Sequence, residues 1–61
     1  MTPEQERWAE ALAVQRIYGD RAAQHAAERV AMLAASGDQD GVARWMAIAC
    51  LLDRLAADVL Q

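Results

Sequence analysis

The fold is decided by residues 34–41, AASGDQDG, where one helical segment must end and another begin. Glycine at position 37 can take the left-handed conformation that terminates a helix, and Asp38 can then accept hydrogen bonds from the first amides of the next. The same pair of residues occurs earlier, as Gly19 and Asp20. The two pairs divide the chain into helices expected at residues 3–18, 21–35 and 39–60.

The first helix has a start signal of its own. Thr2 can cap it, Pro3 suits the first helical position, and Gln5 completes a capping box. Alanine supplies 15 of the 61 residues, against three glycines and one proline, which is a helix-forming composition. We therefore expect one all-α domain over residues 1–61, a three-helix up-down-up bundle with a long third helix.

Apolar residues recur at helical spacing in each segment and predict the core. The face of helix 21–35 consists mostly of alanines, whose small side chains let a neighbouring helix approach closely. The residues expected in the core are Trp8, Leu12, Trp45, Ile48 and Leu52. On the surface of the last helix, Asp40 and Arg44 have the i,i+4 spacing of a favourable charge pair.

A chain of this length has a marginal core, so we expect a second copy to complete it. The single cysteine excludes an internal disulfide, and one cysteine with one histidine cannot close a structural zinc site. Helix 39–60 is apolar around most of its circumference and, at roughly 33 Å, overhangs the other two. The expected interface, in a C₂ dimer or with a different protein, contains Met32, Met46, Cys50, Leu51, Leu55, Val59 and Leu60.

Residues that carry chemistry are few, and we expect no catalytic residue, cofactor or metal. Residues 38–41 match part of a calcium loop, but Ala47 occupies the position of the required glutamate. Cys50 has apolar neighbours and is expected to be a buried, inert thiol. His25 is expected to face solvent; in the alternative of a cofactor- or metal-binding bundle, it would pair with Glu28 or Met32.

A second alternative is a transcriptional accessory or DNA-binding protein of helix-turn-helix type, built from helices 21–35 and 39–60. A recognition helix presents its N-terminal residues to the DNA. Here Asp38 and Asp40 would repel phosphates, with Arg44 alone to compensate, and the net charge is −3. We therefore expect no nucleic-acid binding.

The chain is expected to be cytoplasmic. It has no uninterrupted apolar stretch near the roughly 18 residues of a membrane span. Charged residues in the first ten positions are not typical of a secretory signal, and an unpaired thiol fits a reducing compartment. The expected function is that of a non-catalytic, homodimeric protein-interaction module.

Several of these positions together resemble a family of short bacterial proteins, a domain of unknown function. The residues that carry the resemblance are Trp8, Ala11, Leu12, Gly19, Asp20, Arg29, Leu33, Gly37, Asp38, Gly41, Val42, Trp45, Ile48 and Leu52. The resemblance covers nearly the whole chain, although the final helix is more apolar than in the family. It implies no activity and adds no catalytic residue.

Overall fold

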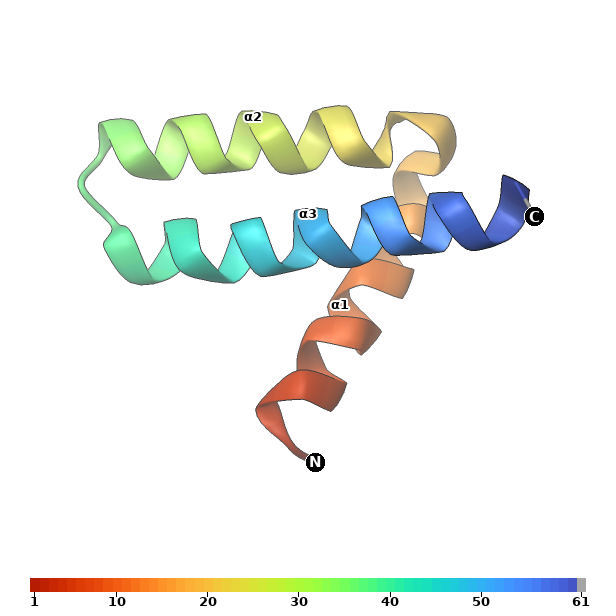
Figure 1. Ribbon diagram of the computed structural model, residues 1–61. Coiled ribbons are helices and arrows are strands. Elements are labelled where there is room, and N and C mark those ends of the chain that lie inside the picture. Colours follow the sequence, from red (N-terminus) through yellow and green to blue (C-terminus); the bar gives the residue numbers. More distant parts are fainter. Residues whose placement is uncertain (61) are drawn as a thin grey trace.

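The computed structural model describes the backbone of residues 1–60 and the side chains of residues 1–57. Its elements are α1 (Pro3–Tyr18), a 3₁₀ turn η1 (Gly19–Arg21), α2 (Ala22–Ala35) and α3 (Gln39–Leu60), shown in Figure 1. No strand occurs in this part of the chain. The prediction of an all-α fold is confirmed.

The helical backbone forms two uninterrupted stretches rather than three separate helices. From Pro3 to Ala35 every residue is helical, because η1 joins α1 directly to α2; non-helical residues interrupt the chain only between Ala35 and Gln39. The first stretch bends at Gly19, whose φ of 58° and ψ of −125° suit glycine. The helix expected at residues 21–35 therefore starts one residue later and continues from a bend.

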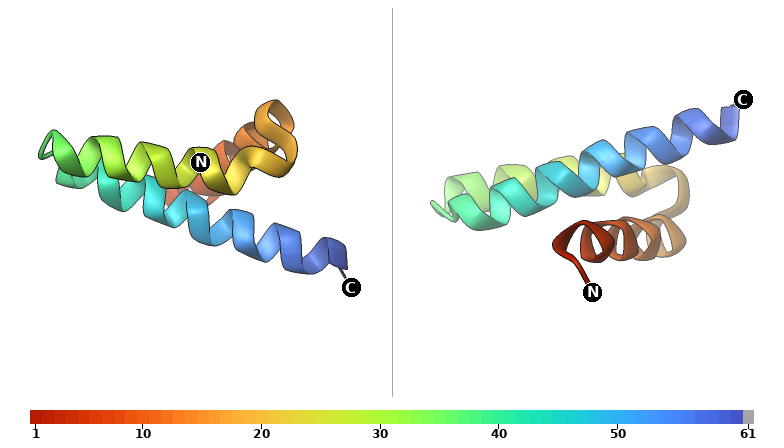
Figure 2. Two further views of the ribbon diagram at one scale, coloured as in Figure 1. Left: turned by 90° about the horizontal axis from the view of Figure 1, so that it is seen from above. Right: turned by 60° about the horizontal axis from the view of Figure 1, so that its bottom comes forward.

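Helices α2 and α3 lie side by side and antiparallel, forming a hairpin, and α1 crosses α3 steeply on one side of it (Figures 1 and 2). The predicted up-down-up bundle, with α1 antiparallel to α2, is therefore wrong. The bend at Gly19 turns α1 away from α2, and α1 makes more of its contacts with α3. The resulting molecule is thin, with extents of 37 × 27 × 17 Å.

The predicted start of α1 is confirmed in its side-chain detail. The Thr2 hydroxyl accepts a hydrogen bond from the Gln5 amide at 3.1 Å, and the Gln5 side chain accepts one from the Thr2 amide at 3.0 Å. Pro3 occupies the first turn, where its missing N–H costs nothing. This reciprocal pair satisfies two amides that the helix leaves free.

The predicted glycine turn and aspartate cap between α2 and α3 are also present. Gly37 has a φ of 79°, and Asp38 Oδ1 accepts a hydrogen bond from the Gly41 amide at 2.9 Å. The Asp38 amide in turn donates to the Leu33 carbonyl at 2.9 Å. A Cβ at position 41 would lie 2.7 Å from Asp38 Oδ2 and 3.2 Å from Leu33 Cδ1, so glycine is required beside this cap.

The core lies where the three helices meet and is small. Its buried members are Ala11, Val14, Ala22, Ala26, Ile48 and Leu52. Two of the predicted core residues, Ile48 and Leu52, are confirmed. Trp8 and Trp45 are half-buried, and the prediction for Leu12 is wrong, because its side chain is 47% exposed. Helix α1 instead presents Ala11 and Val14 to the hairpin.

Candidate protein-interaction surfaces

A charged cluster joins α1 to α3 on the side of the hairpin where α1 packs. Arg44 donates from Nε to Glu10 Oε2 at 2.7 Å and from Nη2 to the same oxygen, while Arg7 Nη1 lies 2.7 Å from Glu10 Oε1. The hydrogen bond from Arg44 to Glu10, and then the carboxylate's charge, raise the pKa of Arg44 above its ordinary value. The predicted pairing of Arg44 with Asp40 is not formed, because Glu10 takes the guanidinium.

A second contact holds the other side of α1. The Arg54 guanidinium lies 5.7 Å from the centre of the Trp8 ring, within cation–π range. Arg44 and Arg54 are ten residues apart, about 15 Å along α3. Between these two contacts the fully buried Ala11 allows close approach of the two helices. The steep crossing of α1 is therefore held at two separated points.

Four side chains cluster where the end of α1 meets the hairpin. The Tyr18 and His25 rings stack with centroids 3.9 Å apart, and His25 meets the edge of Trp45 at 5.5 Å. The Arg29 guanidinium lies 5.5 Å from the centre of the Trp45 ring. His25 is thus half-buried between aromatic rings. The prediction that it faces solvent is wrong. This cluster is a packing contact among the three helices.

The predicted interface residues whose side chains the structure describes differ in exposure. Leu51 and Leu55 are half-buried and pack against the core, whereas Met32, Met46 and Cys50 are exposed. The prediction of a buried Cys50 thiol is wrong, because α3 turns this residue away from both neighbouring helices. The predicted contacts of Val59 and Leu60 lie outside the side chains that the structure describes.

Helical spacing separates the two sides of the hairpin. On α2, His25, Arg29 and Met32 recur every three or four residues, so they share the side on which Tyr18 of α1 packs. The opposite side, which α1 leaves uncovered, is called the free face here. Its residues have the same spacing and are Ala23, Ala27, Val30 and Ala34 of α2 with Val42, Met46, Ala49, Asp53 and Ala56 of α3.

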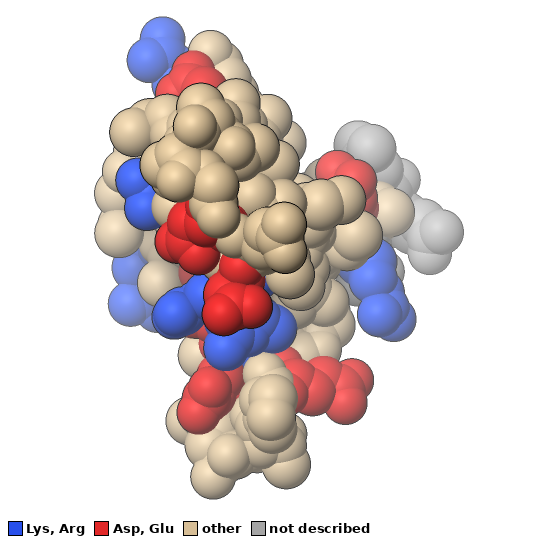
Figure 3. Space-filling model, turned by 90° about the vertical axis from the view of Figure 1, so that its left-hand side faces the viewer, with Lys and Arg blue, Asp and Glu red and all other residues tan. Residues whose placement is uncertain are grey.

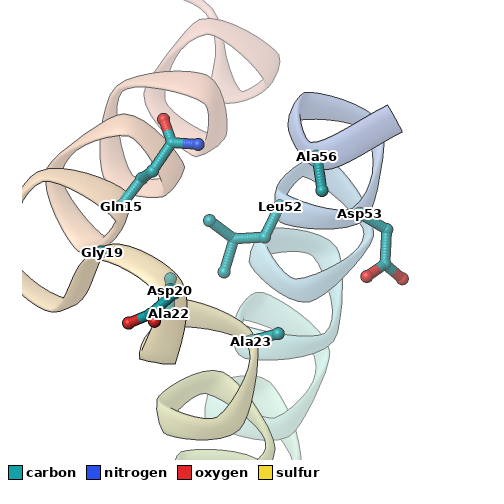
Figure 4. A pocket seen from close by; sticks show the side chains of 8 residues that line it. All are labelled: Gln15, Gly19, Asp20, Ala22, Ala23, Leu52, Asp53 and Ala56. Atoms are coloured by element: carbon teal, nitrogen blue, oxygen red, sulfur yellow. The ribbon is translucent and has the colours of Figure 1, made fainter. Parts of the chain in front are cut away.

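Two shallow apolar hollows lie beside the hairpin, one near each of its ends. The first, of about 380 Å³, lies at the bend and is lined by Gln15 of α1 and by Gly19 and Asp20 of η1, together with residues of α2 and α3 such as Ala23 and Ala56. In Figure 4 Leu52 points into it and the Asp53 carboxylate points away from it. The second, of about 390 Å³, lies beside the α2–α3 turn and includes Ala34 and Met46. The first hollow therefore lies between the end of α1, the bend and the hairpin, whereas the second is formed by α2, the turn and α3.

Charge is distributed unevenly over the molecule. Asp53 is the one charged residue among the nine of the free face, and none of the six arginines belongs to it. On the end of the molecule seen in Figure 3, acidic and basic side chains are intermixed rather than separated by sign. The surface drawn there has no continuous basic area of the kind that binds nucleic acid.

The geometry also bears on the other predicted classes of protein. Helices α2 and α3 run antiparallel, whereas the helices of a helix-turn-helix meet at a large angle, so this pair does not have that geometry (Figure 1). Among the described residues, no group of three or more His, Cys, Asp or Glu side chains is placed to hold a metal ion. Within the same part of the chain, no helix combines the length and the apolar character needed to cross a bilayer.

The sequence profile of a family of unknown function (DUF6961) matches residues 3–59. The chain belongs to this family, and the resemblance to a domain of unknown function is confirmed. Comparisons with curated proteins and with solved structures found no match.

The free face was missed in the analysis of the sequence. The apolar face predicted for α2 includes Ala34, yet Ala34 is exposed, as are Ala23 and Ala27. Helical spacing could have indicated this exposure, because these three alanines lie to one side of the buried Ala22 and Ala26. Alanine occurs on buried and exposed surfaces alike, so its identity alone could not separate the two sides.

Proposed function

We propose that this chain is a non-catalytic protein-interaction module that works as a homodimer in the bacterial cytoplasm. The observation that carries the proposal is its surface area. The chain exposes 4541 Å², whereas a compact monomer of its 6.7 kDa mass would expose roughly 3900 Å². Its radius of gyration of 11.5 Å also exceeds the roughly 10.5 Å of a compact 61-residue domain.

The composition of the core supports the same proposal. Three of the six buried residues are alanines, and Ile48 is the largest described side chain with less than 2% exposure. Large apolar side chains remain exposed instead, among them Ile17, Met32 and Met46. Burying such side chains against a second chain contributes stability that this small core does not supply.

Mass measured by light scattering over a concentration series tests the proposal. We expect a mass of twice 6.7 kDa at high micromolar concentration, with dissociation on dilution. A mass of one chain throughout the series would contradict the homodimer. An absorbance spectrum of the same sample provides a second check, because a bound chromophore would contradict a module that acts through protein contacts alone.

A further inference from the structure

We infer that the second copy binds by exchange of α1: in the dimer, α1 of each chain packs on α3 of the other, and residues 3–35 form one continuous helix. The inference rests on the proposed homodimer and names the element that each copy gives to the other. The surface that receives the exchanged helix is the one on α3 that α1 occupies within a single chain.

A single residue separates α1 and α2 from one continuous helix. Between Pro3 and Ala35, where every residue is helical, Gly19 alone has a positive φ. On either side of it, Tyr18 has φ of −104° and ψ of −12°, and Arg21 has φ of −96° and ψ of 4°. Both lie next to the right-handed helical region. Rotation about the backbone bonds of Gly19, with small adjustments beside it, would therefore straighten the whole stretch.

The contacts that hold α1 are ones that a second copy can supply unchanged. Glu10 binds Arg44, and the Trp8 ring lies beside the Arg54 guanidinium. Between these two contacts the buried Ala11 allows α1 to approach α3 closely. The partners on α3 are far from α1 in sequence, and neither contact depends on the chain connection at Gly19. The structure thus shows which helix fits this surface of α3, and any copy of the chain carries that helix.

The exchange also changes the surroundings of the bend. In a continuous helix Tyr18 and His25, seven residues apart, would be about 10 Å apart along the axis. Their stack, with centroids now 3.9 Å apart, would be lost. In return, the segments around residue 19 of the two chains would meet, because each chain leaves its own hairpin there and enters the other. Ile17, 72% exposed in the single chain, lies two residues from this point and would lie beside the second copy.

Gly19→Ala in the full chain is the first test. The new Cβ disfavours the bent backbone, with φ of 58°, whereas alanine is the best helix former in a straight helix. We expect the dimer dissociation constant, measured by light scattering, to fall at least about tenfold. Asp20→Ala is the control, because it leaves the glycine in place, and it should change the constant less. A dimer that Gly19→Ala weakens overturns the inference.

The charges of the Glu10–Arg44 contact give a test of the exchange itself. Glu10→Arg and Arg44→Glu, made on separate chains, each place like charges between α1 and α3 of one chain. Both side chains are partly exposed, so neither substitution puts a charge into the core. In a mixed dimer with exchanged helices, the introduced arginine meets the introduced glutamate, and the native glutamate of one chain meets the native arginine of the other. Opposite charges are restored only if each α1 packs on the other chain.

The two variants are unfolded together in urea, refolded at equal concentration and weighed by native mass spectrometry. A reducing agent is present because Cys50 is exposed. Random pairing would make half of the dimers mixed, whereas a dissociation constant about tenfold lower for the mixed dimer than for either homodimer would make about nine in ten mixed, which we expect. If the wild type is dimeric but the mixture gives random proportions or no dimer, the exchange is overturned and the proposed homodimer stands. A wild-type monomer overturns both.

Discussion

The same two residues, Gly-Asp, form both connections of this chain, and they form them differently. At Gly37–Asp38 the aspartate caps α3 through the Gly41 amide, and the preceding amides return to carbonyls of α2. At Gly19–Asp20 the chain continues as a 3₁₀ turn, and neither η1 nor α2 starts with a side-chain cap. The Gly19 amide bonds back to the Gln15 carbonyl.

The difference shows what holds each turn in place. The α2–α3 connection is determined by its own hydrogen bonds, which all lie within a few residues. The α1–α2 bend has local backbone hydrogen bonds but no side-chain cap. The direction of α1 is held by distant contacts with α3, namely those of Glu10 and Trp8. An identical dipeptide therefore predicts the place of a turn but not its geometry.

Of the substitutions that test this comparison, Gly19→Ala is expected to lower the free energy of unfolding most. The backbone at Gly19, with φ of 58° and ψ of −125°, is one that residues with a Cβ rarely adopt, although no atom would contact the new methyl. We expect a loss of about 1–3 kcal/mol in the free energy of unfolding, measured by urea denaturation. Gly37→Ala, at φ of 79°, should cost about 1–2 kcal/mol. An unchanged stability for Gly19→Ala would mean that the bend can adopt another backbone conformation.

Asp38→Ala and Asp20→Ala compare the two aspartates directly. Removing the Asp38 carboxylate frees the Gly41 amide that it caps, and we expect a loss of about 1 kcal/mol in thermal or urea unfolding. Asp20→Ala should change stability by less than about 0.5 kcal/mol, since it caps neither η1 nor α2. Equal losses at the two positions would contradict the difference drawn between the turns.

Glu10→Gln has the smallest expected effect and tests whether contacts away from the bend position α1. The carboxylate bonds Arg44 across 34 residues of sequence, but both side chains are partly exposed, so we expect a loss of about 0.5 kcal/mol. The loss should shrink as salt is added, because screening weakens the pair in the wild type. If a double-mutant cycle with Arg44→Gln gave no coupling energy, the Glu10–Arg44 contact would not contribute to the position of α1.

Features that depend on neighbouring residues could be predicted from the sequence. The two ends of α1, the start of α3, the Thr2 capping box and the Asp38 cap follow from signals within three or four positions, and all are present in the structure. The helix predicted at 21–35 starts one residue later in the structure, because Arg21 belongs to η1. Local hydrogen-bonding chemistry was sufficient for these elements.

Features that depend on the crossing of α1 could not be predicted in the same way. Hydrophobicity placed Leu12 in the core, yet the steep crossing turns Ala11 and Val14 inward and leaves Leu12 in solvent. The aromatic surroundings of His25 and the exposure of Cys50 follow from the same arrangement. No periodic pattern in one helix specifies the angle at which a second helix will cross it.

The separation in sequence between α1 and its partner also orders the events of folding. Helices α2 and α3 are joined by three residues, so their pairing requires the closure of a very short loop, whereas the Glu10–Arg44 contact closes a loop of 34. The hairpin is therefore expected to form first and α1 to dock onto it afterwards. During synthesis the helix that is made first is thus the last to reach its place, because its binding surface on α3 is translated at the end.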